Sequence, residues 1–408
     1  MQENETINKI LIWQKFKDAK VLDWIRNATT KDLDRLLFNG KPLFEIPAKD
    51  LYIQALGYKI LAKKAPEIAE IPGLVFPEKM FLEQCSSAWT GDIKAEIFKS
   101  LNAKEIYDIT GGFGIDAWCI SKAVQTYHHF EENEYLQQIA DYNFKSFANN
   151  ITSLAGDALN NLPNAVPKGS WIYADPMRRD SNNKRSNSWE DHRPNPSKLV
   201  ELLKDTAYSG LLIKFSPMNN YSEILELGEG FHKALIAVEV YPELKELLLL
   251  VSKEPLPFAL KVFLANKNGA IECIEYQEFP HTELNPCTSH PGFFYLPGAA
   301  ISKVDLGDVI AAEHDLNKES ASVKVYSSAE PKEIPGFRCF KVLEELNIQT
   351  KALKKKIGKG NWNVISKGFP QSANELTAKY SLVPKGRGYL IFYKGLDGFK
   401  GYETELVD

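Results

Sequence analysis

The chain has 408 residues, enough for two to four domains, and its 44% hydrophobic content is sufficient for substantial cores. The net charge of −4 gives no global basic field, so any contact with nucleic acid has to be local. Five scattered cysteines without metal-ligand spacing indicate reduced thiols in a cytoplasmic protein, with no metal site. The most apolar stretch, 244–251, is too short and too charged to span a membrane.

Residues 1–79 show the spacing of apolar side chains that is typical of helices. Ile10, Trp13, Phe16 and Val21 recur at intervals of three to five residues, and prolines then interrupt the pattern. We therefore predict an N-terminal helical domain that packs on the domain after it.

Short apolar runs alternate with amphipathic ones across residues 80–255. This alternation predicts an α/β, Rossmann-like domain with a mostly parallel, seven-stranded sheet and helices on both faces. The last two strands lie close in sequence, so we expect an antiparallel hairpin at one edge of the sheet. The seven expected strands are 106–109, 126–130, 153–154, 171–174, 211–215, 235–240 and 247–251.

Two small α+β domains are expected after this sheet. Turn signals from Gly and Pro divide 256–335, which predicts a β-rich or ferredoxin-like domain with a linker. In 336–408, the segments 340–346 and 351–357 are expected to be helical, and 362–366 and 388–393 to be strands. From 351 to 408 there are eleven Lys/Arg and five Asp/Glu, a net charge of +6, so basic character is concentrated at this end.

A glycine-rich turn at 108–114 is the most informative motif. Asp108 ends a short strand, and glycines then allow a tight turn that can lie against a flat ligand. A carboxylate just ahead of the glycines attracts a cationic amino acid and disfavours a pyrophosphate. The pattern therefore favours S-adenosylmethionine (SAM) over a dinucleotide. The candidate cofactor-binding residues of this turn are Asp108, Thr110, Gly111, Gly112, Phe113, Gly114 and Asp116.

Two more acids follow at the ends of the next strands. Glu131 stands where a carboxylate can accept hydrogen bonds from both ribose hydroxyls. Asp157, followed by Ala158, stands where an acid can bind the adenine amino group. A dinucleotide site stays open as the alternative. Gly112 begins a G-x-G-x-x-A pattern, and Glu131 lies 19 residues later (131 − 112).

The expected reacting end is Asp175-Pro176, after the strand at 171–174. Methyl transfer is an in-line displacement, so the nucleophile needs positioning and a proton acceptor, which a carboxylate can supply. Lys214 and Ser216, at the end of the fifth strand, are expected to form a further wall. A polar loop at 181–196 is expected to close over the substrate. Candidate catalytic residues are Asp175, Pro176 and Arg178, and candidate substrate contacts near them are Arg179, Lys184 and Arg185.

These motifs resemble those of the class I SAM-dependent methyltransferases. The turn at 108–114 is similar to their first motif, and Asp175-Pro176 to their fourth. More narrowly, the chain resembles Bacteroidetes-type RNA methyltransferases that end in a THUMP-like domain, here 336–408. The resemblance implies that Ser87 and Thr90, ahead of the first motif, lie near the methionine end of the cofactor.

The sequence departs from that pattern at the reacting end. Met177 and Arg178 stand where amino-directed enzymes have a proline and an aromatic ring, and Ser216 replaces the nucleophilic cysteine of uracil C5 enzymes. The methylated atom therefore stays open.

We expect a SAM-dependent methyltransferase that acts on structured RNA, tRNA or rRNA. Lys354, Lys355 and Lys356 are the expected phosphate contacts in the basic C-terminal region. A non-catalytic SAM-binding protein and a small-molecule methyltransferase are the alternatives, and the sequence does not indicate an oligomeric state.

Overall fold

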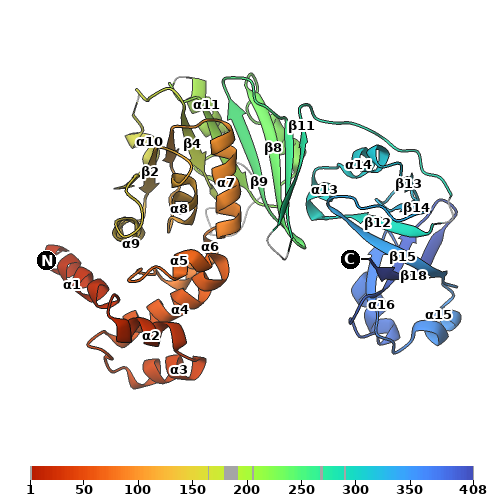
Figure 1. The fold of residues 1–408 in the computed structure, drawn as a ribbon, viewed down its shortest axis with the longest axis horizontal. Coiled ribbons are helices and arrows are strands. Elements are labelled where there is room, and N and C mark those ends of the chain that lie inside the picture. The colour runs from red at the N-terminus through yellow and green to blue at the C-terminus, as the bar shows by residue number, and fades with distance from the viewer. Residues whose placement is uncertain are drawn as a thin grey trace. The chain divides into compact units, whose positions relative to one another are not determined.

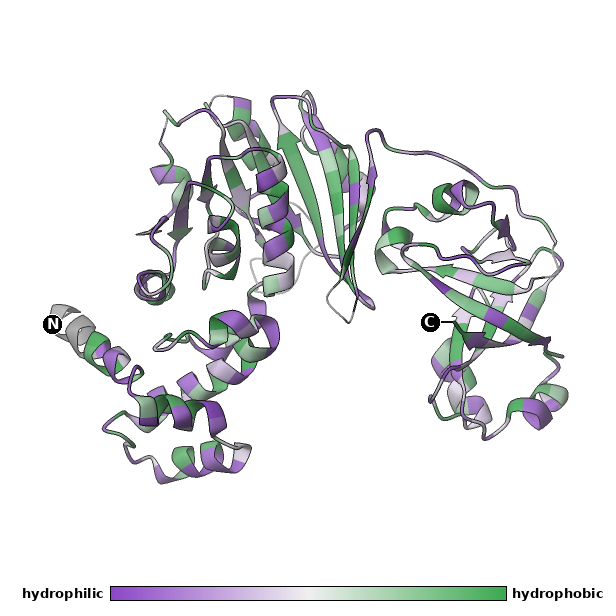
Figure 2. Ribbon diagram, viewed as in Figure 1, coloured by the Kyte–Doolittle hydropathy of each residue, from purple (hydrophilic) through white to green (hydrophobic). Residues whose placement is uncertain are grey.

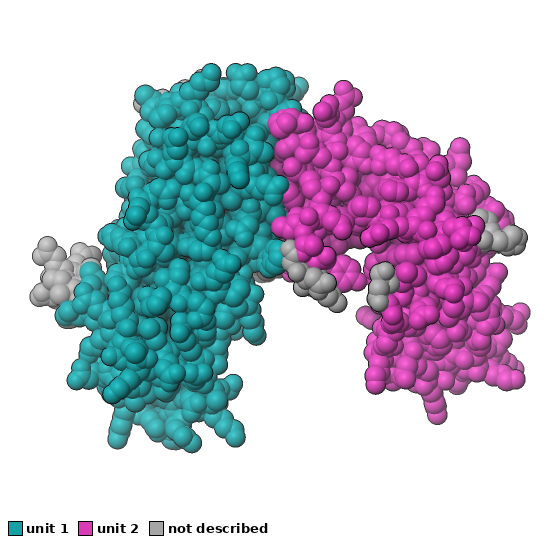
Figure 3. Space-filling view, in the orientation of Figure 1, with its two compact units in different colours: residues 1–233, 248–256 teal, residues 234–247, 257–408 magenta. Residues whose placement is uncertain are grey.

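The structure is a computed structural model that describes residues 2–163, 165–178, 192–204, 206–266, 270–288 and 291–407, without the side chains of 2–8 and 178. The chain separates into two compact units (Figure 3). The first consists of 1–233 and 248–256, and the second of 234–247 and 257–408. The predicted domain boundaries after 79 and after 335 fall inside these units and stay predictions. No helix in the described ranges is long and apolar enough to cross a membrane.

The N-terminal part of the first unit is helical, as the spacing of its apolar residues predicts. Asp18 accepts hydrogen bonds from two main-chain amides at the start of α2, and Thr29 and Asp32 form a reciprocal capping box on α3. The helices bury apolar side chains such as Phe16 and Leu51 against one another. They are α1 (Gln2–Lys15), α2 (Ala19–Asn27), α3 (Thr30–Asn39), α4 (Ala48–Lys64), α5 (Pro66–Ala69) and α6 (Lys79–Gln84) (Figure 1).

Two buried amide side chains join these helices to the α/β part of the same unit. Gln54 of α4 accepts from the amide of Phe76 at 2.9 Å and donates to its carbonyl at 3.0 Å. Asn143 of α9 (Glu134–Phe144) makes the same pair of bonds to Val75, at 2.9 and 2.8 Å. Both amide side chains are buried, so water cannot replace these bonds. We call this arrangement the amide clamp.

The main sheet has nine strands in the order β11-β10-β8-β9-β7-β4-β1-β2-β3. Strands β3, β2, β1, β4 and β7 are parallel, and β10 is parallel to β8. Figure 2 shows how hydrophobic β8 and β9 are, as expected for strands buried on both faces. The strands are β1 (Glu105–Asp108), β2 (Thr126–Glu131), β3 (Ile151–Ala155), β4 (Ser170–Ala174), β7 (Gly210–Phe215), β8 (His232–Val240), β9 (Glu243–Ser252), β10 (Leu260–Ala265) and β11 (Ile271–Tyr276).

The predicted seven strands are all present, but the prediction of a seven-stranded sheet was wrong. Strands β10 and β11 extend the sheet beyond β8, so the β8–β9 pair does not lie at its edge. Prolines at 255 and 257 suggested a new domain at this point. The apolar sequence of β10 nevertheless completes the sheet, because its side chains need a neighbouring strand to be buried.

Strand β1 marks the point at which the order of the sheet reverses. The chain continues from β1 to β2 and β3 on one side, and β4 lies on the other side. Open α/β sheets bind ligands at such a point, outside the carboxyl ends of the strands. The helices of this part are α7 (Ala88–Ser100), α8 (Ile115–Ser121), α10 (Ala158–Asn161), α11 (Pro196–Lys204) and α12 (Tyr221–Glu226), and a small β5–β6 pair links 177–178 with 192–193.

The second unit contains a seven-stranded sheet in the order β13-β14-β12-β15-β18-β17-β16. Residues from both predicted C-terminal domains therefore share one sheet. Its strands are β12 (Phe293–Pro297), β13 (Asn317–Lys318), β14 (Tyr326–Ser328), β15 (Phe337–Glu345), β16 (Asn363–Lys367), β17 (Gly388–Lys394) and β18 (Phe399–Leu406). The helices are α13 (Ala299–Lys303), α14 (Gly307–Glu313), α15 (Thr350–Ile357) and α16 (Ala373–Tyr380).

The expected helix at 340–346 was wrong, because these residues belong to strand β15. Phe340 and Val342 pack into the core of this sheet, whereas Lys341 and Leu343 are exposed. This alternation has the period of a strand.

The amide clamp leads to a stability prediction. Asn143→Ala leaves the buried amide and carbonyl of Val75 without partners, so we expect the free energy of unfolding to fall by about 2–4 kcal/mol. Asn27→Ala, on the exposed face of α2, is the control and should cost less than about 1 kcal/mol. Urea denaturation followed by circular dichroism measures both, and equal losses would contradict the assigned role of Asn143.

Candidate active site

The turn between β1 and α8 depends on its glycines for two different reasons. A Cβ on Gly111 would lie 2.3 Å from the His129 ring, and a Cβ on Gly114 2.4 Å from the Phe144 ring. These two positions require glycine because the protein itself packs against them. Gly112 has φ +59°, and a Cβ there would meet only one atom, the carbonyl oxygen of Thr110 at 3.9 Å. The space beside Gly112 is therefore open to a ligand.

The His129 side chain of β2 is hydrogen-bonded to the backbone of the turn. Because the carbonyl oxygen of Gly112 can only accept, Nε2 of the histidine donates to it, at 3.2 Å, and the Ser153 hydroxyl donates to Nδ1 at 3.0 Å. Burial lowers the pKa of His129 to about 4, so the ring is neutral at physiological pH. The histidine therefore supports the backbone of the turn from within the core.

Asp108 is almost completely buried at the end of β1. Its Oδ1 accepts from the amide of Thr110 at 3.0 Å, and its Oδ2 accepts from the Tyr127 hydroxyl at 2.8 Å. Burial raises the pKa of Asp108 to about 7, and the negative charges of Asp116 and Asp175 add to this shift. The carboxyl group therefore fixes the start of the turn, and its contact with a ligand ammonium stays a prediction.

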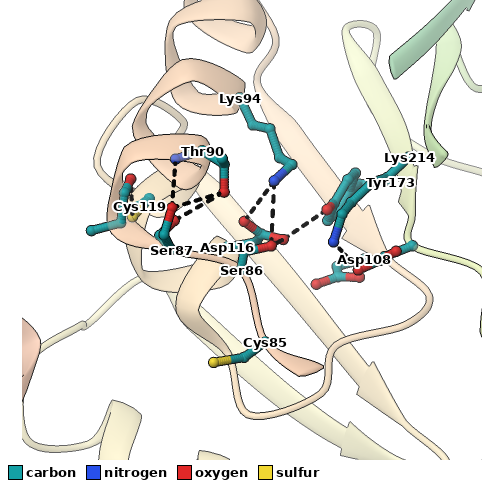
Figure 4. A network of polar contacts seen from close by, with 12 residues as sticks. Cys85, Ser86, Ser87, Thr90, Lys94, Asp108, Asp116, Cys119, Tyr173 and Lys214 are labelled. Atoms are coloured by element: carbon teal, nitrogen blue, oxygen red, sulfur yellow. Dashed lines mark hydrogen bonds and ion pairs between the residues drawn. The ribbon is translucent and has the colours of Figure 1, made fainter. Parts of the chain in front are cut away.

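A buried ion pair lies beside the turn (Figure 4). Lys94 of α7 is completely buried, and its Nζ lies 3.1 Å from Oδ1 of Asp116 in the first turn of α8. Oδ2 of Asp116 accepts from the hydroxyls of Tyr173 at 2.7 Å and Ser86 at 2.8 Å. Burial alone would raise the pKa of Asp116, but Lys94, Lys214 and the two hydroxyls outweigh it and lower the pKa.

A second ion pair is located where β4 and β7 end. Nζ of Lys214 lies 2.6 Å from Oδ2 of Asp175. The main-chain amide of Asp175 also donates to the Thr110 hydroxyl at 2.7 Å, which ties the end of β4 to the glycine turn. The Asp175 side chain is 35% exposed, so a ligand can reach its carboxylate. Pro176 is buried directly after it.

The two acids that are predicted to bind the ribose and the adenine of the cofactor, Glu131 and Asp157, occupy different environments. Oε2 of Glu131 accepts from the amide of Gly112 at 2.8 Å, and Oε1 from the amide of Asn133 at 2.8 Å. Burial raises the pKa of Glu131, although these amides oppose the shift. Asp157 is exposed and caps α10 by accepting from the amide of Leu159 at 2.9 Å.

The other candidate cofactor residues have structural contacts. Ser87 caps α7 by accepting from the amide of Thr90 at 3.3 Å, and the Thr90 side chain is buried. Phe113 packs against Phe76 with ring centroids 6.3 Å apart, and Ala158 is buried. Their predicted ligand contacts therefore stay predictions.

Most of the predicted substrate residues near the expected reacting end lie outside the described residues. Arg179, Lys184 and Arg185 lie outside the described residues, and only the backbone of Arg178 is described, in β5. Lys354 and Lys355 are exposed on α15 of the second unit. Lys356 is bound within that unit, because its Nζ lies 2.5 Å from Oε2 of Glu344 and 3.6 Å from Oε2 of Glu403.

Sequence reasoning missed Lys94, Tyr173 and His129 as parts of this site. The one available signal was Lys94 itself, a lysine between the apolar residues Ile93 and Ile97 of one helix face. In the parts of the chain that the structure describes, no cluster of three or more His, Cys, Asp or Glu side chains is placed to hold a metal ion.

Comparison with known proteins gives a match to one family model and matches to solved structures. Residues 337–403 match the family model of the THUMP domain-like domain. The fold of nearly the whole chain matches a crystal structure described as a "putative methyltransferase from Porphyromonas gingivalis W83", with a TM-score of 0.79 and 24% identity over 95% of this chain and 98% of that chain. No curated protein sequence matches the chain.

Two smaller structures are more distant. An O-methyltransferase from Bacillus cereus in complex with SAH has a TM-score of 0.33 and 12% identity over 47% of this chain and 100% of that chain. A "putative RNA methyltransferase" from Pyrococcus horikoshii has a TM-score of 0.30 and 15% identity over 47% and 95%. Likeness at this level does not bear on the site.

The predicted resemblance is confirmed by the first two matches. The chain has a methyltransferase fold with a THUMP-like C-terminal region. At 24% identity the likeness concerns the fold, and the substrate has to be argued from the residues themselves.

The packing of Gly111 on His129 leads to a second stability prediction. In Gly111→Ala the new methyl group meets the ring at 2.3 Å, so we expect a loss of about 1–3 kcal/mol in the free energy of unfolding. In a His129→Ala background the same substitution should cost less than about 1 kcal/mol, because the ring is absent. Equal costs in the two backgrounds, measured by urea denaturation, would contradict this origin of the glycine.

Proposed function

We propose that this protein is a SAM-dependent methyltransferase that acts on structured RNA, tRNA or rRNA. The observation that carries the proposal is the convergence of the open glycine position, Gly112, with Glu131 and Asp175 at the point where the sheet reverses. The dinucleotide alternative is less suitable, because Asp108 and Asp116 place two carboxyl groups beside the turn that a pyrophosphate would occupy.

The residues present fit an adenosyl amino-acid cofactor. Gly112 leaves room for a flat group, and the carboxyl group of Glu131 is held against the turn by two main-chain amides, with lone pairs left for ribose hydroxyls. Asp157 is exposed at the end of β3, where it would accept from an adenine amino group. SAM supplies an electrophilic methyl group when bound.

Asp175 is the group best placed to act on the methyl acceptor. Lys214 and the hydroxyl of Thr110 fix the carboxylate and its backbone at the end of β4. From this position the carboxylate would accept a hydrogen bond or a proton from the attacking atom and hold that atom in line. Because Lys214 acts through Asp175, it is a positioning residue.

The C-terminal region supports RNA as the substrate. Residues 337–403 match the THUMP domain-like model, and residues 351–408 have a net charge of +6. Lys354 and Lys355 are exposed on α15. Phosphate contacts by such lysines make binding weaker as salt rises. Lys356 contributes less, because Glu344 and Glu403 already neutralise it.

The catalytic role of Asp175 leads to a direct test. Asp175→Asn should lower methyl incorporation into RNA at least about 10²-fold, because proton transfer and positioning of the acceptor are lost. Its affinity for SAM should stay within about threefold. Asp141→Asn, which removes a partly exposed carboxylate of α9 that is paired with Lys145, is the matched control and should leave the rate unchanged.

The measurement is radioactive methyl transfer from SAM into total RNA of a strain that lacks the protein, followed by mass spectrometry of the nucleosides. Incorporation that survives Asp175→Asn would contradict the assigned role. SAM binding without transfer to RNA, protein or small molecules would instead indicate the non-catalytic alternative. Methyl transfer only to a small molecule would indicate that the protein is a small-molecule methyltransferase.

The raised pKa of Asp108 predicts that protons are released when SAM binds. At a pKa of about 7, Asp108 is about half protonated at pH 7, and a ligand ammonium beside it would lower that pKa. SAM binding should therefore release up to about half a proton at pH 7, more at pH 6 and less at pH 8. Calorimetry in buffers of different ionisation enthalpy measures this release.

Asp108→Asn is the matched variant for this experiment and should abolish the release. If wild type and variant release the same number of protons, Asp108 only holds the turn and does not meet the ammonium.

A further inference from the structure

The second unit contains a pocket of about 460 Å³ whose residues come from β8, β10, β11, β12, α13, β15 and β16 and from the turns beside them. This volume lies in the range of small-molecule sites. Charged and polar side chains that line it are Glu239, Tyr241, Asn266, Glu272, Ser302, Arg338 and Lys367. None of them belongs to the glycine turn or to its ion pairs.

Two cations and two carboxylates line this pocket, and the cations are not paired with the carboxylates. Arg338 comes from β15 and Lys367 from the end of β16, and no carboxylate of the described residues forms an ion pair with either. Burial, and then the charge of Arg338, lower the pKa of Lys367. The guanidinium carbon of Arg338 lies 5.5 Å from the centroid of the Phe340 ring, which restrains it. An anion between the two cations would relieve both the burial cost and the repulsion.

Of the two carboxylates in this pocket, Glu272 is exposed and Glu239 has a main-chain partner. Glu239 is buried, and its Oε2 accepts from the amide of Ala300 at 2.7 Å. A Cβ on Gly298 would lie 3.0 Å from both carboxylate oxygens, so glycine at this position lets the carboxylate approach the backbone. Glu239 is therefore held by the main chain, without an ion pair to either cation, and keeps lone pairs for donors of a ligand.

We propose that this pocket binds a phosphate-bearing nucleotide, with the phosphate between Arg338 and Lys367 and hydroxyl or amino donors directed at Glu239. A guanidinium matches two phosphate oxygens at once, and the ammonium supplies a second charge-assisted bond. A nucleotide combines an anion with several donors, as this lining requires. The same chemistry is present in a free mononucleotide and in the terminal nucleotide of an RNA.

The test is isothermal titration calorimetry on the full chain. The probes are uridine 5′-monophosphate, uridine, and a short RNA with and without a 5′-phosphate. Arg338→Gln and Lys367→Gln should each weaken binding of the phosphorylated probes about tenfold. Lys341→Gln, an exposed lysine of the same strand β15 that does not line the pocket, is the matched control and should change nothing.

A second measurement uses the wild-type protein and needs no amino-acid substitution. Binding of the phosphorylated probe should raise the pKa of Lys367, measured by NMR of its labelled side chain, because the anion favours the charged form. Tighter binding of the mononucleotide assigns the pocket to a free nucleotide, and tighter binding of the phosphorylated RNA assigns it to an RNA end. Equal affinity for uridine and its phosphate, no binding by either phosphorylated probe, or an equal loss in Lys341→Gln would overturn the proposal.

Discussion

The site depends on the buried ion pair between Lys94 and Asp116. It joins α7 to α8, and the hydroxyls of Tyr173 and Ser86 extend it to β4 and to the segment ahead of α7. Removing one partner of a buried pair leaves a charge without compensation and costs about 3–5 kcal/mol, a large part of a domain's total stability. The position of the glycine turn is therefore fixed by a charge pair that no ligand needs to supply.

Strands β2 and β4 are each tied to that turn by polar contacts at their carboxyl ends. Thr110 accepts from the amide of Asp175, Glu131 accepts from the amide of Gly112, and the ring of His129 donates to the Gly112 carbonyl. A ligand that enters would meet groups already held in one arrangement. Such preorganisation lowers the entropy lost on binding.

The sequence was sufficient for the glycine turn and for the strands around it, because short apolar runs that end in acids are local signals. The sequence did not show why each position in the turn has to be a glycine. Gly111 packs on His129 from the next strand, a contact that only the folded sheet creates. Lys94 was missed for the same reason, since a lysine is interpreted as exposed until its partner from another helix is known.

Longer-range pairing also explains the errors in the fold. Strands β10 and β11 were not expected in the main sheet, because prolines precede β10, and only the pairing of β10 with β8 shows that they extend it. Residues 340–346 were expected to be helical, but the strands β12 and β18 on either side make them part of a sheet. Arg178, Arg179, Lys184 and Arg185 fall where side chains or whole residues lie outside the description.

The amide clamp has a consequence for how this protein can be divided. Phe113 of the glycine turn and Leu136 and Ile139 of α9 share one apolar core with the N-terminal helices. A fragment beginning after residue 79 would bare this core and leave Asn143 facing solvent, next to the turn that Gly112 opens. The N-terminal helices thus support the candidate catalytic part, and expressing that part alone would remove apolar side chains that pack behind its glycine turn.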